Sequence, residues 1–209
     1  MKLSKKRVNK TRRSNVTSRI VFRMGKRIYL RAVLTEDIPL ITVWINDPEV
    51  HQFLKIAYPM SPEDEKKWQE GLAGKKPGDV VFAIVLADTD EIIGVMGLHH
   101  IDHRNGLATT GAFIGRKDLW SKGYGTEAKM LVLEYAFNTL NLRKVCSAVY
   151  DFNGRSKRCL EKCGYTPEGC RKKHLYRNGR FVDEYLMAVF KEDFLPRFEK
   201  FKKEFLESK

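Results

Sequence analysis

The chain has 209 residues, of which 43% are hydrophobic, and it carries a formal net charge of +13. This length and apolar content suffice for one sizeable core and predict one folded domain. No apolar run reaches the length of a membrane span, and the N-terminus lacks the apolar core of a secretory signal, so we expect a cytoplasmic protein without a membrane partner. The four cysteines form no Cys-x-x-Cys pair and no zinc-finger spacing with histidine, which predicts reduced thiols and no metal site.

The positive charge is concentrated at the N-terminus. Residues 1–27 contain eleven lysines and arginines and no acid, whereas the other 28 bases are nearly balanced by 26 acids. So basic and apolar-poor a segment does not pack as core, and residues 1–25 therefore predict a flexible arm. Three interpretations stay open: a solvated tail without a partner, a contact with RNA or the ribosome, and an organellar transit peptide.

The first half of the chain predicts helices and strands in mixed order. A strand over residues 27–33 leads to a helix that is entered at 35–37. A second helix begins at Ser61-Pro62-Glu63-Asp64, where a capping residue, a proline at the first helical position and early acids agree. Residues 75–79 predict a turn. Strands rich in β-branched residues are predicted over 80–87, 92–97 and 108–115, the first two joined as a hairpin.

The second half predicts a helix after a glycine-rich loop, then a strand over residues 144–150 and a short helix over 153–162. A connection over 164–169 leads to two strands that meet at Asn178-Gly179, a pair that favours a tight hairpin turn. The last helix, over 193–206, places four aromatic rings on one face, which predicts core packing. These rings are Phe194, Phe198, Phe201 and Phe205.

The most informative segment is Trp120-Ser121-Lys122-Gly123-Tyr124-Gly125-Thr126-Glu127-Ala128, where a loop turns into a helix. Gly123 and Gly125 can adopt positive φ and let a ligand approach the main chain. The first helical turn offers free N–H groups with the positive end of the helix dipole behind them, and both favour an anion. The segment therefore predicts a phosphate-binding loop.

Two other nucleotide motifs compete with this interpretation. The Walker pattern fails because Lys122 precedes the glycines and no Gly-Lys-Ser/Thr follows. Residues 123–128 satisfy the dinucleotide fingerprint Gly-x-Gly-x-x-Ala, with Asp151 at the end of the next predicted strand. However, the polar residues 116–122 separate the glycines from the preceding strand, and only 84 residues follow Gly125. That is too short for most of a dinucleotide domain, which remains the weaker alternative.

The order of the elements and four motifs resemble the GNAT superfamily of acyl-CoA N-acyltransferases, over roughly residues 26–192. Besides the segment 120–128, the motifs are Trp44-Ile45-Asn46-Asp47-Pro48-Glu49-Val50, Asn153 with Ser156, and Lys162-Cys163-Gly164-Tyr165. Together they resemble the branch of ribosomal-protein N-terminal and spermidine acetyltransferases. Trp120 stands where the generic family motif has Arg or Gln, but a tryptophan at this position is ordinary for this branch.

The resemblance implies an α/β (α+β) fold of the GNAT type. Its central sheet would be mixed and mostly antiparallel, with about six to seven strands flanked by helices, and two parallel strands would splay apart at the acetyl-CoA site. Residues 1–25 would be the arm, 26–192 the acetyltransferase domain and 193–209 an amphipathic C-terminal helix. The implied partners are a peptide or small-amine substrate, and a homodimer is a further expectation.

The resemblance also implies acetyl-CoA as the co-substrate, with no metal. The backbone of residues 122–126 would hold its pyrophosphate, and the strand over 112–115 would pair with the pantetheine arm as an extra strand would. A backbone N–H there would polarise the thioester carbonyl. The expected cofactor-binding residues are Phe113, Ile114, Lys122, Gly123, Tyr124, Gly125, Thr126, Asn153 and Ser156.

The expected catalytic residues are Ser156 and His174. An attacking amine must be neutral, and the departing thiolate benefits from a proton. Leu160 stands where relatives carry a tyrosine, whereas Ser156 matches the serine of the ribosomal-protein branch and is the expected donor, unless it only caps the helix or binds pantetheine. His174 lies near a family base position, and His99 and His100, near the end of an earlier predicted strand, are further imidazoles able to act as a base.

The pKa of the acceptor amine helps to choose between the possible classes of substrate. An α-amine has a pKa of about 7.7–8.0 and an alkylamine about 10.4, so the neutral alkylamine costs roughly 3.5 kcal/mol more. No carboxylate base is found over residues 107–115, and the basic arm repels polycations, so both observations favour an α-amine. We therefore expect an N-acetyltransferase for a protein N-terminal α-amine of the ribosomal-protein type. The alternatives are an acetyltransferase for a polyamine, amino sugar or aminoglycoside, and a non-catalytic RNA or ligand-binding module.

Overall fold

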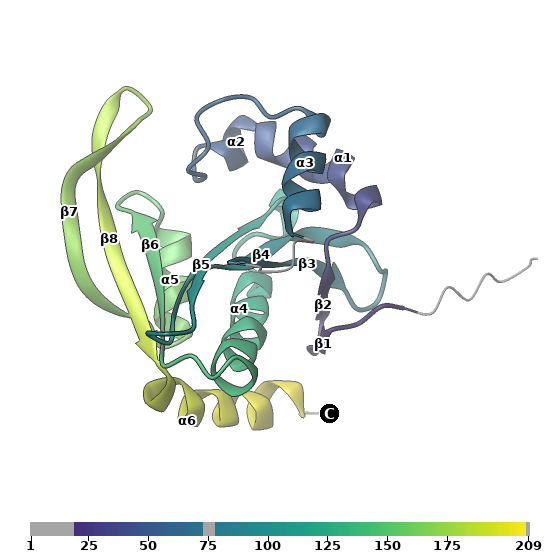
Figure 1. Ribbon diagram of the computed structural model, residues 1–209, viewed down its shortest axis with the longest axis vertical. Coiled ribbons are helices and arrows are strands. Elements are labelled where there is room, and N and C mark those ends of the chain that lie inside the picture. The colour runs from purple at the N-terminus through teal and green to yellow at the C-terminus, as the bar shows by residue number, and fades with distance from the viewer. Residues whose placement is uncertain (1–18, 73–77, 208–209) are drawn as a thin grey trace, which may run out of the picture.

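The computed structural model describes residues 19–72 and 78–207, in which helices cover both faces of one sheet (Figure 1). The strands are β1 (Arg23–Met24), β2 (Ile28–Ala32), β3 (Val80–Leu86), β4 (Ile92–Asp102), β5 (Leu107–Ile114), β6 (Lys144–Tyr150), β7 (Thr166–Arg177) and β8 (Arg180–Phe190). The helices are α1 (Ile38–Asn46), α2 (Pro48–His51), α3 (Pro62–Leu72), α4 (Tyr124–Glu134), α5 (Gly154–Lys162) and α6 (Lys191–Phe201). Single 3-10 turns precede α1 and the loop before α4, and π-helical turns extend α4 and α6.

The sheet has the strand order β1-β2-β3-β4-β5-β6-β8-β7, and β5 with β6 is its parallel pair. The predicted mixed and mostly antiparallel sheet is confirmed, with eight strands over the described residues instead of six to seven. The difference arises because Arg23 and Met24 pair with β2, an element too short to show a hydrophobic period. Just before them, Phe22 stacks on Phe82 with ring centroids 5.0 Å apart. The folded part therefore begins before residue 26.

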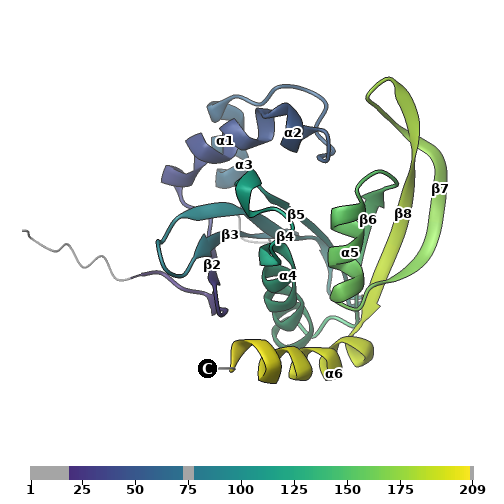
Figure 2. The same cartoon turned by 180° about the vertical axis from the view of Figure 1, so that it is seen from behind.

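Alternate residues of the central strands enter two separate cores, as the two-residue period of a strand requires. In β2, Ile28 and Leu30 pack in the core with α4 and α6, whereas Tyr29 belongs to the core with α1. The view from behind shows α4 against one face of the sheet and α6 crossing below it, with α1, α2 and α3 on the other side (Figure 2). Both faces are therefore covered.

The last helix packs only partly as predicted. Phe194 and Phe198 are buried and Phe201 packs against them, which confirms core packing for these three rings. Phe205 stacks on Phe201, with ring centroids 5.0 Å apart, and the Arg27 guanidinium lies 5.1 Å from the Phe205 ring centroid. The fourth ring thus continues the row of stacked rings beyond the buried core. No helix within the described ranges is long and apolar enough to cross a membrane.

Several element ends differ from their predicted positions. β4 continues past residue 97 to Asp102, which pairs with Leu107, so His99 lies within the strand although its local pattern is polar. β7 begins at Thr166, inside the predicted connection, because this segment pairs with β8. The predicted hairpin turn is confirmed by positive φ at Asn178 and Gly179. Residues 1–18 of the predicted arm, 73–77 in and before the predicted turn, and 208–209 lie outside the described residues.

Candidate active site

The parallel strands β5 and β6 are paired only where they begin. Leu107 is opposite Lys144, Ala108 opposite Val145 and Thr109 opposite Cys146. Beyond these pairs the main chains diverge. At the branch point the Ser147 hydroxyl donates to the Thr110 carbonyl oxygen at 3.2 Å. The structure thus contains the splayed parallel pair expected from the sequence, and a gap opens between the two strands.

The open edge of β5 presents backbone groups to this gap. Gly115 N–H donates to the Ile93 carbonyl of β4 at 2.8 Å. The N–H and C=O groups of successive residues in a strand point to opposite edges. Those of Phe113 therefore also face β4, whereas those of Ile114 face the gap. Consistently, the indole N–H of Trp120 reaches the Ile114 carbonyl from that side at 2.7 Å. A ligand lying in the gap can therefore pair with the backbone of Ile114.

A cavity of about 730 Å³ occupies the gap and continues along the loop into α4. Seven of the nine predicted cofactor-binding residues line it: Phe113, Ile114, Gly123, Tyr124, Gly125, Thr126 and Ser156. The other two, Lys122 and Asn153, do not line the cavity. The Asn153 side chain caps α5 by accepting the Ser156 N–H at 3.1 Å, and the Lys122 carbonyl accepts from Arg27 Nη1 at 2.9 Å.

The junction between the loop and α4 has the geometry of an anion site. Gly123 is the N-cap with φ +88°, where a side chain would be strained. Gly125 has open space in front of it: a Cβ there would meet nothing closer than Ile114, at 3.9 Å. The first N–H groups of a helix have no partner within it, and those at Gly125 and Thr126 lie at the cavity wall. A diphosphate therefore fits this junction.

A buried carboxylate fixes the junction to the turn between β1 and β2. Glu127 is 1% exposed and accepts the backbone N–H groups of Lys26 and Arg27, each at 2.8 Å. Its second oxygen accepts from Arg27 Nε at 2.9 Å. The same guanidinium lies 4.5 Å from the Tyr124 ring centroid. The sequence does not reveal this contact, because Arg27 and Glu127 lie 100 residues apart in the chain.

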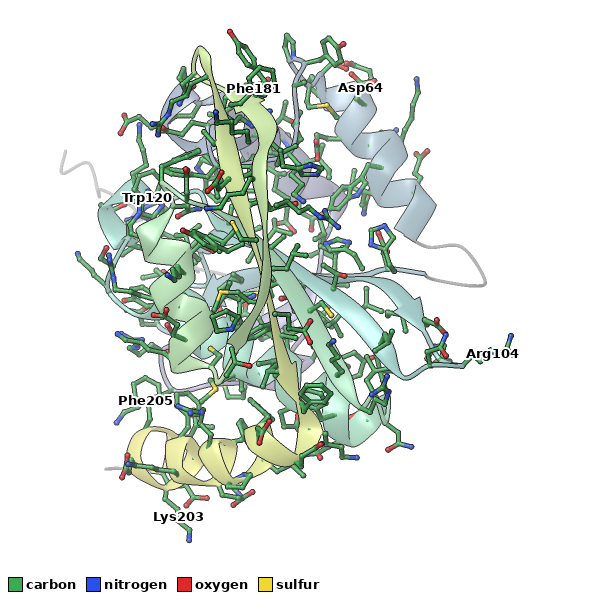
Figure 3. The ribbon with its side chains drawn as sticks, turned by 90° about the vertical axis from the view of Figure 1, so that its left-hand side faces the viewer. Asp64, Arg104, Trp120, Phe181, Lys203 and Phe205 are labelled. Carbon is green, nitrogen blue, oxygen red and sulfur yellow. The ribbon has the colours of Figure 1, made fainter. Side chains whose placement is uncertain are left out.

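Two tryptophans hold the far end of β5. Trp120 lies beside the start of α5 (Figure 3), with the Arg155 guanidinium 3.8 Å from its ring centroid. Phe53 meets the same indole edge-on, with centroids 6.4 Å apart. On the other side, the Trp44 ring packs directly on Gly115, where a Cβ would collide with it. The open edge of β5 is therefore rigidly placed beside the cavity.

Comparison with known proteins identifies this arrangement. Residues 27–166 match the acetyltransferase (GNAT) domain family. The chain belongs to the GNAT acetyltransferases. It is 29% identical over 178 residues to the uncharacterized N-acetyltransferase p20 of Bacillus licheniformis, covering 81% of this chain and 96% of that protein. It is 30% identical over 102 residues to the putative ribosomal N-acetyltransferase YdaF of Bacillus subtilis, covering 49% of this chain and 55% of that one.

A solved structure shows the same fold. The spermidine N-acetyltransferase of Vibrio cholerae, in complex with CoA and spermine, superposes with a TM-score of 0.75 at 22% identity, over 81% of this chain and 98% of that one. The family fixes the reaction, which is acetyl transfer from acetyl-CoA to an amine. The described residues contain no group of three or more His, Cys, Asp and Glu side chains able to hold a metal ion.

The two predicted catalytic residues of this GNAT enzyme lie in different places. Ser156 is in the first turn of α5 and lines the cavity. His174 is on β7, with its side chain 44% exposed and Nε2 3.9 Å from the buried carboxylate of Glu184. It is not among the residues that line the cavity. The structure therefore brings Ser156, and not His174, to this cavity.

A different histidine of the acetyltransferase does line the cavity. His99 Nδ1 lies 2.9 Å from Asp79 Oδ2, and the other oxygen of Asp79 accepts the His100 N–H at 2.9 Å. Burial raises the pKa of Asp79, but these two hydrogen bonds outweigh it, and the pKa lies below its ordinary value. A Cβ on Gly97 would lie 2.6 Å from His99 Nε2, so the second ring nitrogen sits over the middle of β4. The sequence offered His99 as one of several histidines, with nothing to connect it to Asp79.

Polar side chains of the acetyltransferase are also buried beneath the branch point. Lys129 of α4 donates to the Thr110 hydroxyl at 3.1 Å, and burial lowers the pKa of this amine. Cys159 of α5 lies 3.5 Å from the Thr126 hydroxyl. A hydrogen bond from Cys163 and the nearby Lys129 lower the pKa of Cys159 to about 6, against the effect of burial. All four cysteines are free.

Proposed function

We propose that this acetyltransferase acts on the α-amine of a polypeptide and holds acetyl-CoA in the gap between β5 and β6. The observation that carries the proposal is the continuous cavity from the loop at Gly125 to the open backbone edge at Ile114. Main-chain amides at the start of α4 would bind the diphosphate, and the edge of β5 would pair with the pantetheine arm. When bound, acetyl-CoA supplies an activated acyl group at a thioester.

The charges around the cavity support both halves of this assignment. Five cationic side chains line it, and no carboxylate does so among the described residues. The cations are Lys55, Lys129, Arg155, Arg158 and Lys162. Such a wall attracts the phosphates of CoA and repels a polycation. The V. cholerae spermidine enzyme resembles this chain at 22% identity, a level that supports the fold and not the substrate.

The transfer forms a bond between the amine nitrogen and the acyl carbon and breaks the carbon–sulfur bond. An α-ammonium gives up one proton before it attacks and a second as the new bond forms. The departing sulfur takes up one proton, so each turnover releases one proton. In this proposal Ser156, which lines the cavity, donates to the sulfur, and a backbone N–H of the β5 edge stabilises the developing oxyanion.

The acceptor assignment is tested by following thiol release from acetyl-CoA with the full chain. We expect turnover with peptides that have a free N-terminus, none with the same peptides blocked at the α-amine, and little with spermidine. Thiol release with spermidine alone would overturn the proposal in favour of a small-amine enzyme. Absence of turnover with every amine, together with retained RNA binding, would instead favour a binding module.

We further infer that the basic N-terminal segment brings this enzyme to RNA-bound substrates. Eleven bases without an acid in residues 1–27 form the electrostatic signature of a polyanion contact. Deleting residues 1–18, which leaves β1 in place, is expected to weaken salt-dependent RNA binding and to spare turnover of short peptides. Unchanged RNA affinity, measured by fluorescence anisotropy at two salt concentrations, would refute this role.

A further inference from the structure

A second cavity, of about 390 Å³, adjoins the acetyl-CoA cavity. Its volume falls within the range of small-ligand sites, about 300–1,000 Å³. It lies between α1, α3 and the strands β3, β4 and β5. The two spaces meet along one common wall, because seven residues line both cavities: Leu54, Lys55, Ile56, His99, Gly111, Ala112 and Phe113. A group held in the second cavity thus lies next to a ligand held in the gap between β5 and β6.

The second cavity is strongly apolar. Most of its surface is formed by aliphatic and aromatic side chains of α1, α3 and the sheet. These include Ile41, Ile45, Met60, Trp68, Val81 and Val95. Walls of this composition favour a large apolar side chain by the ordinary hydrophobic effect.

One carboxylate stands in this apolar wall. Glu65, in the first turn of α3, is 4% exposed and lines the cavity. Among the described residues nothing donates a hydrogen bond to its carboxylate and no cation pairs with it, whereas its neighbour Asp64 caps the helix at Ser61. Burial, and next the charge of Asp64, raise the pKa of Glu65. The carboxylate oxygens are accessible from the cavity, so a ligand that supplies a cation is their natural partner.

The shared wall contains a proton acceptor. Asp79 holds His99 by Nδ1, which leaves Nε2 free to meet a group between the two cavities. An imidazole oriented in this way by a carboxylate is a common general base. The second cavity therefore combines a carboxylate, an apolar surface and a base in one chamber that adjoins the candidate acetyl-CoA cavity.

We propose that the second cavity is the acceptor chamber, and that it selects polypeptides whose first residue has a large apolar side chain. Glu65 pairs with the α-ammonium as it enters, the apolar walls take the side chain, and His99 Nε2 removes the proton before the amine nitrogen attacks the acyl carbon. The proton then passes from His99 to solvent. This inference rests on the proposed function, because it assumes that the acceptor is a polypeptide α-amine.

The test uses the full chain and peptides that differ only in their first residue: Leu, Met, Phe, Gly or Asp. We expect kcat/KM for the Leu, Met and Phe peptides to exceed that for the Gly peptide at least tenfold. Glu65→Gln should raise KM for the Leu peptide about tenfold and leave kcat within about twofold. Glu63→Gln, on the exposed side of the same helical turn, is the matched control and should leave both constants unchanged. His99→Gln should lower kcat about a hundredfold on every peptide.

The outcomes separate this inference from the function beneath it. Equal turnover of Leu and Gly peptides, or wild-type kinetics of Glu65→Gln, would overturn the acceptor chamber while leaving a peptide acetyltransferase. Turnover of spermidine without turnover of any peptide would overturn the proposed function itself. Calorimetric titration with CoA, expected to give wild-type affinity for Glu65→Gln, shows that a changed KM does not arise from a misfolded acetyl-CoA site.

Discussion

Replacing Glu127 with glutamine removes the charge that fastens the phosphate-binding loop to the β1–β2 turn. A glutamine oxygen can keep the two backbone N–H groups of Lys26 and Arg27, which now lie 2.8 Å from Oε1. The amide NH₂ would then face Arg27 Nε, which now donates to the carboxylate at 2.9 Å. The substitution therefore replaces one charge-assisted hydrogen bond with two donors that face each other.

The size of the effect follows from these contacts. A hydrogen bond to a charged group contributes about 1.5–3 kcal/mol. Arg27 is 35% exposed, and water compensates part of the loss, so we expect Glu127→Gln to lower the free energy of unfolding by about 1–2 kcal/mol. In a chain of this size that corresponds to a fall in Tm of about 2–8 °C. Glu127→Ala also strands two backbone N–H groups and should cost about 3–4 kcal/mol.

Urea denaturation and CoA titration measure the two consequences together. Glu134→Gln is the matched control, since Glu134 lies on the same helix and pairs with Arg23 at 3.2 Å with both side chains partly exposed. Such a pair contributes about 0–1 kcal/mol. The affinity for CoA should fall for Glu127→Gln and stay at the wild-type level for Glu134→Gln. If the two variants unfold at the same urea concentration, Glu127 does not anchor the loop as described.

Four further substitutions test other parts of the structure. Gly115→Ala should lower the free energy of unfolding by about 1–3 kcal/mol, because the new Cβ collides with the Trp44 ring. Gly71→Ala is the control: its Cβ meets open space in a helix, so it should raise stability slightly. Thermal unfolding compares the two variants. Burial raises the pKa of Glu184, but hydrogen bonds and charges from Lys55 and Arg171 outweigh it, so the pKa lies below its ordinary value of 4.5. The ionised carboxylate therefore stabilises the fold above pH 4.5, and this contribution is lost as the pH falls through the lowered pKa. Glu184→Gln should accordingly be less stable than wild type at pH 7 and converge with it in acid, as followed by urea unfolding across pH. Glu65→Gln should be more stable than wild type at pH 8 by about 1 kcal/mol, because burial disfavours the ionised carboxylate and raises its pKa. This gain should vanish below pH 4.5, the ordinary pKa of the group, where the carboxyl is protonated in both the folded and the unfolded chain. A variant that is less stable than wild type at pH 8 would contradict the unpaired state of Glu65.

The parts of the site that the sequence predicts are those with a local cause. The glycines at 123 and 125 before an amphipathic run predict the loop and α4, and Asn153 predicts the cap of α5. Asn178-Gly179 predicts the last hairpin turn because both residues tolerate positive φ. Each of these features depends on residues within one or two turns of chain, where side-chain chemistry and backbone conformation are directly coupled.

The parts that the sequence does not predict depend on contacts across the fold. Asp79 meets His99 only because β3 and β4 place them at the same end of the sheet, and Glu65 faces a cavity only because α3 packs over that face. The choice between Phe113 and Ile114 as the backbone facing the gap requires the register of β5 against β4. A two-residue strand such as Arg23–Met24 has no period at all, so only its partner reveals it.

Calorimetric titration of CoA into Gly125→Asp tests most directly whether the main-chain amides at the start of α4 bind the CoA diphosphate. A Cβ at Gly125 meets open space, and an acid in the first turn suits the helix dipole, so the variant should fold with an unchanged or slightly higher Tm. Its carboxylate would occupy the approach to the N–H groups and repel the phosphates. We expect CoA to give a measurable heat of binding with the wild-type protein and none with this variant. Wild-type affinity in a folded Gly125→Asp protein would contradict the account.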